Sequence, residues 1–356
     1  MKKLIAMLLA LVMILSLTAC GGSSAPAADA PAAESPAADA PAADAPAEEP
    51  AEKIVIRLAD VQAENDVETQ FEYKFAELVA EKSGGRIEVQ VFPAGQMGEM
   101  ADILSSVQMG ALEMCRTNPS WLADAGAKSL NLLSLPFIFT GLEQSTEVLE
   151  GEIGEKMLQE VLDVDIGVRG LGYLEASGRY FFFTEKEVSN LEEIAGLKLR
   201  VPTNALATAM VESCGASATP IGYNELYSAL QTGIVDGADN PLKGILNMSF
   251  YEVSTYVLDL AHQYEASIIL IGENFWQTLS TEDQAILQEA MDEASEYYKE
   301  ISRAALDGYR GALEEKGMTF ITPDNPQEWI DAVTPMYAEF SVGYEDLLQQ
   351  LIDAQG

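Results

Sequence analysis

Histidine is nearly absent from this chain of 356 residues, which contains one His and three Cys. Many hydrolases place a histidine beside the reacting group or a metal, so any such arrangement here depends on His262 alone. The Gly-x-Ser-x-Gly, Cys-x-x-Cys and His-Glu-x-x-His motifs and glycine-rich phosphate loops are missing from the sequence. We therefore expect no catalytic residues, no metal site and no cofactor.

Basic residues are also scarce, since 20 Lys and Arg face 57 Asp and Glu, for a formal net charge of −37. Nucleic-acid binding needs a basic surface, so this balance argues against a nucleic-acid partner. Beyond the first residues, no apolar run approaches the roughly 20 residues of a membrane-spanning helix. The scarcity of basic residues draws attention to each arginine that lies within an apolar motif.

The first residues have the pattern of a secretion signal. An almost wholly apolar run over residues 4–19 ends at Leu17-Thr18-Ala19-Cys20, which resembles the lipobox of bacterial lipoproteins. The resemblance implies removal of residues 1–19 and acylation of Cys20, which anchors a protein stably. We therefore expect an extracytoplasmic, lipid-anchored protein, in the periplasm or on the outer face of the cell membrane. The alternative is ordinary secretion after cleavage behind Ala19.

Residues 20–52 consist mostly of Ala, Pro, Asp and Glu, which predicts an extended acidic spacer. About 300 residues follow, enough for two lobes. The remaining cysteines, Cys115 and Cys214, either form a disulfide or stay as two buried thiols, and the sequence favours neither.

Segments with strand and helix periodicity alternate from residue 54 onward. Strands are expected at residues 54–59, 86–92, 111–115, 197–201, 218–221, 234–238 and 267–271, with a long β-rich stretch at 167–185. Helices are expected at 69–83, 99–110, 144–161, 205–214, 225–232, from 242 onward, and from 280 to 316. This order predicts an α/β fold with two lobes and a cleft outside the carboxyl ends of the strands.

The segment 197–202 carries an arginine at the end of a predicted strand. Alternation places three apolar side chains on one face and Lys198 and Arg200 on the other, and Pro202 then ends the strand. A guanidinium at that position can hold a carboxylate through two parallel hydrogen bonds. The alternative is an arginine that reaches from the strand end into solvent.

Other polar and aromatic side chains occupy comparable positions. Asn240 precedes Pro241 after the strand at 234–238, where it can cap the next helix or contact ligand oxygens. Tyr223 can form an aromatic wall or a hydrophobic staple at a helix start. Two further side chains follow the predicted strand that ends at Cys115: Asn118 and Trp121.

Residues 196–202 and 220–241 together closely resemble the hallmark of the TRAP-transporter solute receptors, the DctP-like family. Four other segments agree with the family in order: 92–98, 110–113, 135–139 and 276–284. The resemblance implies a two-lobed periplasmic-binding-protein-like fold with hinge strands and a long helix crossing both lobes. Lobe I would comprise 54–176 plus 266–305, and lobe II 177–265 plus 306–356.

The resemblance also implies roles for individual residues. Arg200 matches the arginine that clamps the ligand carboxylate, Asn240 its partner asparagine, and Arg179 a second arginine. Tyr223 falls where an aromatic side chain packs on the ligand, and Asp60 lies near a first-strand contact position.

Asn118 and Trp121 stand where the receptor for sialic acid has charged residues, which argues against sialate as the ligand.

The implied function is a monomeric, non-enzymatic receptor that passes a small organic acid to the small and large membrane subunits of a TRAP transporter. A uronate or aldonate suits the amide and aromatic groups best. A C4-dicarboxylate would use Arg179 and Arg200 together. A surface enzyme acting on a carboxylated sugar and a ligand sensor are the alternatives from other classes.

Overall fold

The structure is a computed structural model that describes residues 53–354. The predicted signal peptide at 1–19, the lipidation site at Cys20 and the spacer to residue 52 lie outside the described residues. None of the helices formed by residues 53–354 combines the length and the hydropathy that a membrane span requires.

The strands of the described residues are β1 (Ile54–Ala59), β2 (Ile87–Phe92), β3 (Met114–Thr117), β4 (Val168–Phe183), β5 (Lys198–Val201), β6 (Ser217–Pro220), β7 (Gly237–Pro241), β8 (Tyr256–Leu258), β9 (Gln263–Gly272) and β10 (Thr319–Ile321). The α-helices are α1 (Val67–Lys82), α2 (Met100–Gln108), α3 (Pro119–Ala125), α4 (Leu142–Glu150), α5 (Glu152–Asp163), α6 (Leu191–Ile194), α7 (Ala205–Ser213), α8 (Leu226–Gln231), α9 (Leu242–Asn247), α10 (Glu273–Trp276), α11 (Thr281–Glu315), α12 (Pro326–Val333), α13 (Tyr337–Phe340) and α14 (Glu345–Asp353). Short 3₁₀ turns lie at η1 (Lys128–Ser134), η2 (Tyr223–Glu225), η3 (Phe250–Glu252) and η4 (Thr334–Met336).

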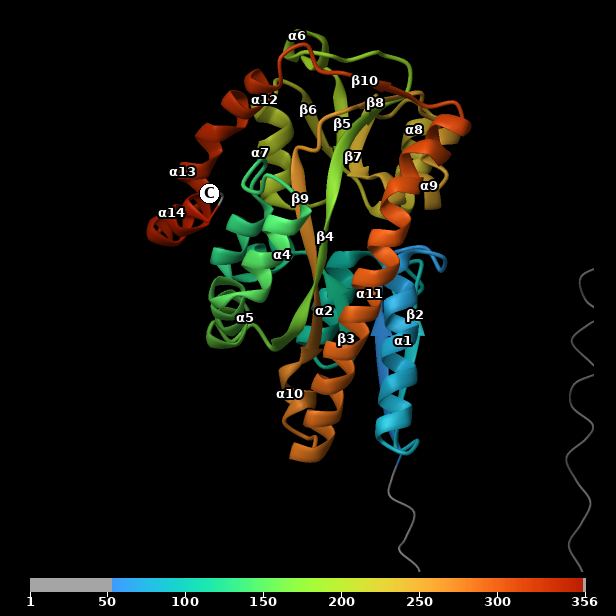
Figure 1. Ribbon diagram of the computed structural model, residues 1–356, viewed down its shortest axis with the longest axis vertical. Coiled ribbons are helices and arrows are strands. Elements are labelled where there is room, and N and C mark those ends of the chain that lie inside the picture. The colour runs from blue at the N-terminus through green and yellow to red at the C-terminus, as the bar shows by residue number, and fades with distance from the viewer. Residues whose placement is uncertain (1–52, 355–356) are drawn as a thin grey trace, which may run out of the picture. The chain divides into compact units, whose positions relative to one another are not determined.

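All these strands belong to one mixed sheet with the central order β2-β1-β3-β9-β4-β7-β5-β6, while β8 pairs with β4 and β10 with β8. We call β2, β1 and β3 with their helices the first half, and β7, β5 and β6 with theirs the second half. The antiparallel strands β9 and β4 join the two halves, and Figure 1 shows them running through the middle of the molecule. Both halves are parallel within themselves, which matches the predicted α/β cycles.

The joining strands are apolar on both faces because helices cover each side of the sheet. Ile269 and Ile271 of β9 pack with Phe71 and Phe75 of α1 and with α11. The alternate side chains, such as Ile268, face the opposite core, which α5 and η1 help to form. The sheet therefore fixes the positions of the polar groups that follow its strand ends.

Helix α11 begins after Ser280, whose hydroxyl accepts a hydrogen bond from the backbone N–H of Asp283 at 3.1 Å. The helix packs against α1 in the first half and against α9 in the second half. In Figure 1 it rises beside β4 from α10 to the region of α9. The sequence prediction of a long helix that crosses both parts of the molecule is confirmed.

Four predicted elements have different bounds in the structure, among them the strand expected at 111–115, which is β3 at Met114–Thr117. The helix expected at 144–161 is two helices, because the extended backbone of Gly151 ends α4 and begins α5. The strand expected at 234–238 is β7 at Gly237–Pro241, so Asn240 lies within a strand and does not cap the following helix. The strand expected at 267–271 begins earlier, at Gln263.

Two of the three predicted lobe boundaries fall inside the joining strands, and the third, between residues 305 and 306, falls inside α11. The division between residues 176 and 177 lies in β4 at a shift in its register with β9, and the division between 265 and 266 lies in β9. We retain these two boundaries as a proposal about where the halves hinge. A hinge needs only a few residues that absorb the change in backbone angles.

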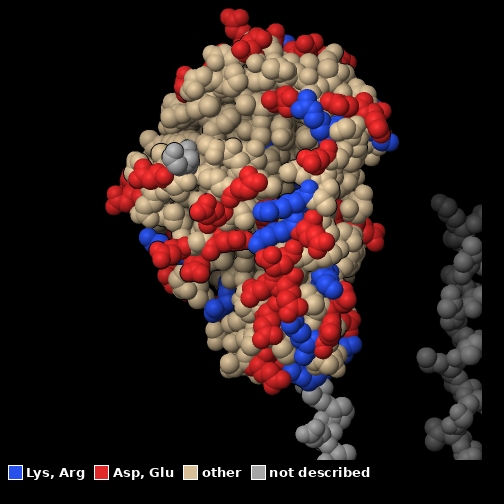
Figure 2. Space-filling view, in the orientation of Figure 1, with Lys and Arg blue, Asp and Glu red and all other residues tan. Residues whose placement is uncertain are grey.

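The acidic excess of the chain lies on its surface. Figure 2 shows Asp and Glu side chains gathered over the lower part of this face, where Figure 1 places α11 and α1. Some of these carboxylates are paired, as in the contacts of Lys82 with Glu293 and of Arg86 with Asp283. The carboxylates on this face are therefore solvated or paired at the surface. The buried arginines have separate environments.

Candidate functional site

A cleft of about 620 Å³ opens where the two halves of the sheet meet. Residues from both halves and from the joining strands line it: Val61, Gln62, Glu99, Met100, Arg116, Asn118, Ser120, Trp121, Arg179, Arg200, Pro202, Thr203, Asn204, Ile221, Gly222, Tyr223, Asn240 and Glu265. The lining includes three arginines, although the chain has few basic residues. Such convergent polar groups in a concave site are typical of a ligand pocket.

Arg200 reaches the cleft from the carboxyl end of β5. Its backbone neighbours Leu199 and Val201 are fully buried on the other face, and Arg200 itself is only 4% exposed. Its Nε donates to the backbone oxygen of Ile221 at 2.8 Å, and its Cζ lies 5.7 Å from the centre of the Tyr223 ring. The alternative of an arginine reaching into solvent therefore does not hold.

Arg200 has no carboxylate ion-pair partner among residues 53–354. Burial lowers the pKa of its guanidinium to about 10, and the nearby charge of Asp239 offsets only part of that effect. An arginine with this pKa is still charged at neutral pH. The cleft therefore contains a buried cation whose charge no neighbouring carboxylate balances.

Arg179, from β4, has a different environment. Its Nε donates to Asp239 Oδ2 at 2.7 Å, and its Nη1 donates to Glu265 Oε2 at 3.1 Å. Burial lowers the pKa of the Arg179 guanidinium, but the charges of Asp239 and Glu265 outweigh burial and hold it above its usual value. Arg179 is thus already neutralised from within the protein.

Asn240 and Tyr223 form one wall of the cleft. The amide of Asn240 donates to the hydroxyl of Tyr223 at 3.4 Å, and the Tyr223 ring meets Phe250 edge-on with ring centres 6.1 Å apart. Burial raises the pKa of Tyr223 to about 12, so its hydroxyl stays protonated. A Cβ on Gly244 would lie 3.1 Å from both the Asn240 amide nitrogen and the Tyr223 hydroxyl, so the glycine leaves room for this pair.

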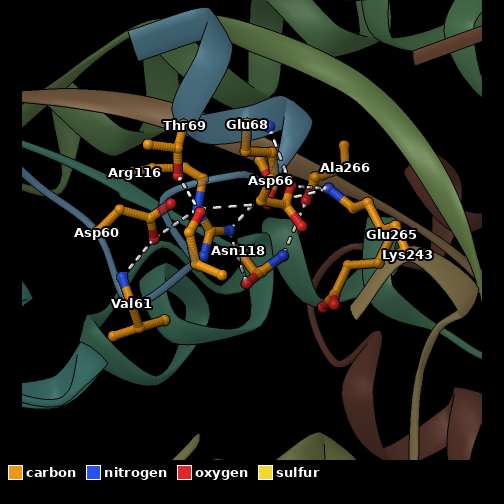
Figure 3. Close-up of polar contacts among 12 residues, drawn as sticks. Asp60, Val61, Asp66, Glu68, Thr69, Arg116, Asn118, Lys243, Glu265 and Ala266 are labelled. Atoms are coloured by element: carbon orange, nitrogen blue, oxygen red, sulfur yellow. Dashed lines mark hydrogen bonds and ion pairs between the residues drawn. The ribbon is translucent and has the colours of Figure 1, made fainter. Parts of the chain in front are cut away.

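The opposite wall comes from the end of β3 and the start of α3, with Asn118 and Trp121. The amide of Asn118 donates to the backbone oxygen of Ala266 at 3.2 Å. Figure 3 shows Arg116 between Asn118 and Asp60, and its Nε donates to Asp60 Oδ1 at 2.8 Å. Asp60 is fully buried behind Arg116, and it is not among the residues that line the cleft.

Glu99 connects the two halves at the mouth of the cleft. Its carboxylate accepts from the backbone N–H of Tyr223 at 2.9 Å and from that of Asn224 at 3.3 Å. A Cβ on Gly222 would approach this carboxyl group to 2.7 Å. Because Gly222 has no side chain, the Glu99 carboxylate of the first half can reach the backbone N–H groups of the second half.

His262 and the two cysteines lie away from the cleft lining. The His262 ring is buried and stacks on Phe181 with ring centres 4.3 Å apart, while its Nε2 lies 3.5 Å from Asp239 Oδ2. Cys115 and Cys214 are both buried and free, which decides between the two alternatives for these thiols. Within residues 53–354, no group of three or more His, Cys, Asp or Glu side chains is arranged to hold a metal ion.

The structure therefore brings together six of the seven binding residues expected from the sequence, while Asp60 supports Arg116 from behind. Sequence reasoning missed Arg116, Glu99 and Glu265 as cleft residues. Arg116 could have been found, because it follows the apolar pair Met114-Cys115 in a predicted strand. No comparable local pattern marks Glu99 or Glu265 among so many acidic residues.

Comparison with protein families gives one match over most of the chain. Residues 58–342 match the model of family 7 of the bacterial extracellular solute-binding proteins, DctP. A solute-binding protein of Roseobacter denitrificans is 32% identical over 274 residues, which cover 77% of this chain and 83% of that protein. The C4-dicarboxylate-binding periplasmic protein DctP of Rhodobacter capsulatus is 27% identical, over 82% of this chain and 87% of that protein.

A solved structure extends this similarity to the fold. The TRAP periplasmic solute-binding protein of Bradyrhizobium sp. BTAi1, in complex with α/β-D-galacturonate, superposes with a TM-score of 0.79 at 30% sequence identity. The match covers 84% of this chain and 99% of that protein. Nearly the whole of a known two-lobed binding protein is thus reproduced here.

Proposed function

The chain belongs to family 7 of the bacterial extracellular solute-binding proteins, and on that premise we propose that it binds a sugar-acid anion through Arg200. It is a TRAP-type solute-binding protein. The proposed ligand is a uronate or an aldonate, held in the cleft between the two halves of the sheet. The role proposed for the protein is binding and release, without a chemical step.

The observation that carries the proposal is the charge balance of the three cleft arginines. Arg116 faces Asp60, and Arg179 faces both Asp239 and Glu265. Arg200 alone lacks such a partner within the described residues. A buried charge without a counterion is costly, so an incoming carboxylate at Arg200 gains both Coulomb attraction and a bidentate hydrogen bond.

The remaining lining suits the hydroxyl groups of a sugar acid. Asn118, Asn240 and Asn204 offer amide donors and acceptors, and Trp121 and Tyr223 offer apolar ring faces. The relative in complex with galacturonate is 30% identical to this chain. The relative named for C4-dicarboxylates is 27% identical, but a second carboxylate would have to compete with Glu265 and Asp239 for Arg179.

The proposal extends to the partners of the protein. We expect the loaded receptor to release its ligand to the small and large membrane subunits of a TRAP transporter. We also expect lipid on Cys20 to hold the protein at the outer face of a membrane, with the acidic segment to residue 52 as spacer. A monomer suffices for this role, because the described cleft is formed by one chain.

A thermal-shift screen of sugar acids, dicarboxylates and other small acids tests the proposal. At a ligand concentration of 100 times Kd, binding adds about 2.7 kcal/mol to the stability of the folded protein. We expect the stabilisation with a uronate or an aldonate, and we expect Arg200→Ala to abolish it because the carboxylate loses its only unbalanced cation.

Arg169→Ala is the matched control for this screen. Its guanidinium also lies over an aromatic ring, 5.2 Å from the centre of Trp276, but it pairs with Glu273 outside the cleft. This variant should keep the full ligand response. A ligand response that survives in Arg200→Ala, or a screen in which no sugar acid stabilises the wild type, would contradict the proposal.

A further inference from the structure

Resting on the proposed sugar-acid function, we propose that Glu265 selects singly charged polyhydroxy acids and rejects dicarboxylates. Its carboxylate would accept a hydrogen bond from a ligand hydroxyl and repel a second ligand carboxylate. Neither the family match nor the pattern of the sequence assigns a role to this residue. The proposal therefore narrows the ligand class of the site that Arg200 defines.

The position of Glu265 follows from the alternation of the joining strands. Arg179 of β4 and Glu265 of β9 both face the cleft. Their neighbours Tyr180 and Tyr264 face a separate groove on the other side of these strands, beside α11. Since β4 and β9 are the connection between the halves, Glu265 lies at the floor of the cleft whatever ligand binds above it.

The hydrogen bonds of Glu265 leave one oxygen available. Its Oε2 accepts from Arg179 Nη1 at 3.1 Å, whereas among residues 53–354 its Oε1 accepts only from the Ser134 hydroxyl, at 3.5 Å. A separation of 3.5 Å is at the outer limit for such a bond, and each carboxylate oxygen has two lone pairs. In Figure 3 no dashed line joins Glu265 to the network of Asp60, Arg116 and Lys243. A ligand hydroxyl can therefore donate to Oε1 at better geometry than Ser134 does.

The charge of Glu265 also decides which ligands fit. Burial and the charge of Asp239 raise the pKa of this carboxyl group above its usual value, while Arg179, which donates to Oε2 at 3.1 Å, favours the ionised form. When Glu265 is ionised, a second ligand carboxylate meets a like charge in a buried site, where Coulomb repulsion is poorly screened. A hydroxyl at the same place meets a charged acceptor, which makes a stronger bond than a neutral one.

Two substitutions separate the acceptor role from the charge. Glu265→Gln keeps the size of the side chain but removes its charge, which frees Arg179 Nη1 for a second carboxylate. We expect the ratio of the Kd for malate to the Kd for galacturonate to fall about tenfold or more. Glu265→Asp keeps the charge but withdraws the oxygens by one methylene, so galacturonate affinity should fall while malate stays excluded.

Calorimetric titration with galacturonate and with malate at neutral pH measures both constants, and ligand-free melting temperatures report on folding. Glu273→Gln is the matched control, because it removes the same charge from a Glu–Arg pair outside the cleft. Should Glu265→Gln fail to fold, Glu265→Asp, which retains the counterion of Arg179, decides the question. The proposal is supported if Glu265→Asp binds galacturonate more weakly and still excludes malate. It is overturned if the affinity of this variant for galacturonate is unchanged.

The outcomes distinguish this inference from the function on which it rests. If the wild type binds galacturonate, Arg200→Ala does not, and Glu265→Gln leaves the ratio unchanged, the role of Glu265 is overturned while the proposed function stands. If the wild type binds malate in preference to galacturonate, or binds neither through Arg200, the sugar-acid function fails and the selection by Glu265 fails with it.

Discussion

Four acidic side chains and two basic ones are buried in one cluster beside the cleft: Asp60, Asp66, Glu68, Glu72, Arg116 and Lys243. Arg116 pairs with Asp60, and Lys243 pairs with Asp66 and Glu68. Glu72 has no ion-pair partner among the described residues. Burial and the charges of Asp60 and Glu68 raise the pKa of Glu72 well above its usual range. The cluster therefore keeps a proton on Glu72 at a pH where exposed glutamates are ionised.

The raised pKa predicts a pH-dependent effect of Glu72→Gln. The folded chain binds the Glu72 proton more tightly than the unfolded chain, so the wild type loses stability as pH rises above about 4.3. The loss approaches about 1.4 kcal/mol for each unit by which the folded pKa exceeds the unfolded one. The neutral amide avoids this loss, so urea unfolding should find the variant more stable than wild type at pH 8 and nearly equal at pH 4.5.

Glu68→Gln is the contrasting variant for this experiment. Burial alone would raise the pKa of Glu68, but Arg116 and Lys243 lower it to about 2. The folded state thus favours ionised Glu68. This preference stabilises the folded protein at pH values above the pKa of the unfolded chain, and the stabilisation is lost as pH falls through the pKa of the folded state. Glu68→Gln should therefore destabilise the protein at neutral pH. If Glu72→Gln destabilises the protein equally at pH 4.5 and pH 8, the prediction that Glu72 is protonated in the folded state is contradicted.

The two free cysteines give a second prediction at this scale. Burial raises the pKa of Cys115 far above its usual value and that of Cys214 to about 12. The thiolate is the reactive form, so both thiols should resist an aromatic disulfide reagent in the folded protein and react together on unfolding. Rapid labelling of either thiol in native buffer would show that the segment around it opens locally.

At the scale of elements, the start of α1 contacts α9, which belongs to the second half. Lys243 Nζ of α9 lies 3.1 Å from Asp66 Oδ1 and 3.1 Å from Glu68 Oε2, and Asn247 Nδ2 donates to Asp66 Oδ2 at 3.0 Å. Asp66 also caps α1 by accepting from the backbone N–H of Glu68 at 3.0 Å. These contacts join the first half to the second half, and we expect them to break when the two halves separate.

Lys243→Met should therefore loosen the closed state. The substitution leaves the Asp66 carboxylate buried without a cation and leaves Glu68 with Arg116 alone, a penalty that we expect in the closed form only. We expect a dissociation rate constant for the sugar acid that is about tenfold higher or more, measured by stopped-flow fluorescence.

Lys82→Met is the matched control for this comparison. Lys82 also extends from α1, but it pairs with Glu293 of α11 away from the cleft. Its removal should leave ligand dissociation unchanged. If both lysine variants release ligand at the rate of the wild type, the contact between α1 and α9 does not hold the cleft closed.

At the scale of the whole molecule, the chain combines an acidic exterior with a few neutralised interior arginines. The net charge of −37 would repel an anionic membrane surface, so electrostatic attraction cannot hold this protein at a bilayer. Membrane association then depends on the acyl chains proposed for Cys20, which lies outside the described residues.

Cys20→Ser tests that dependence in cells. The variant should lose incorporation of labelled fatty acid and move from the membrane fraction to the soluble extracytoplasmic fraction. Binding of the sugar acid by the purified variant should equal that of the wild type, because the cleft is formed by residues 61–265. A variant that stays in the membrane fraction without label would indicate a different mode of attachment.

Much of the element order follows from the sequence, because strand and helix periodicities are local properties. The positions of β1, β2, β5, α7 and α11 agree with expectation within one or two residues. Other bounds differ because tertiary pairing overrides local pattern: β7 extends through Pro241 to pair with β4, and β9 begins at Gln263 opposite Arg179. The helices at the C-terminal end, from α12 onward, were not anticipated.

The sequence by itself determined which arginine would stand at a strand end, because the alternation around Arg200 and the stop at Pro202 are written in adjacent residues. Only the tertiary structure decided which arginines are neutralised. Arg179 meets Glu265 across 86 positions and Lys243 meets Asp66 across 177, and nothing in the local pattern links such pairs. Periodicity depends on neighbours along the chain, whereas the charge that a buried group experiences depends on neighbours in space.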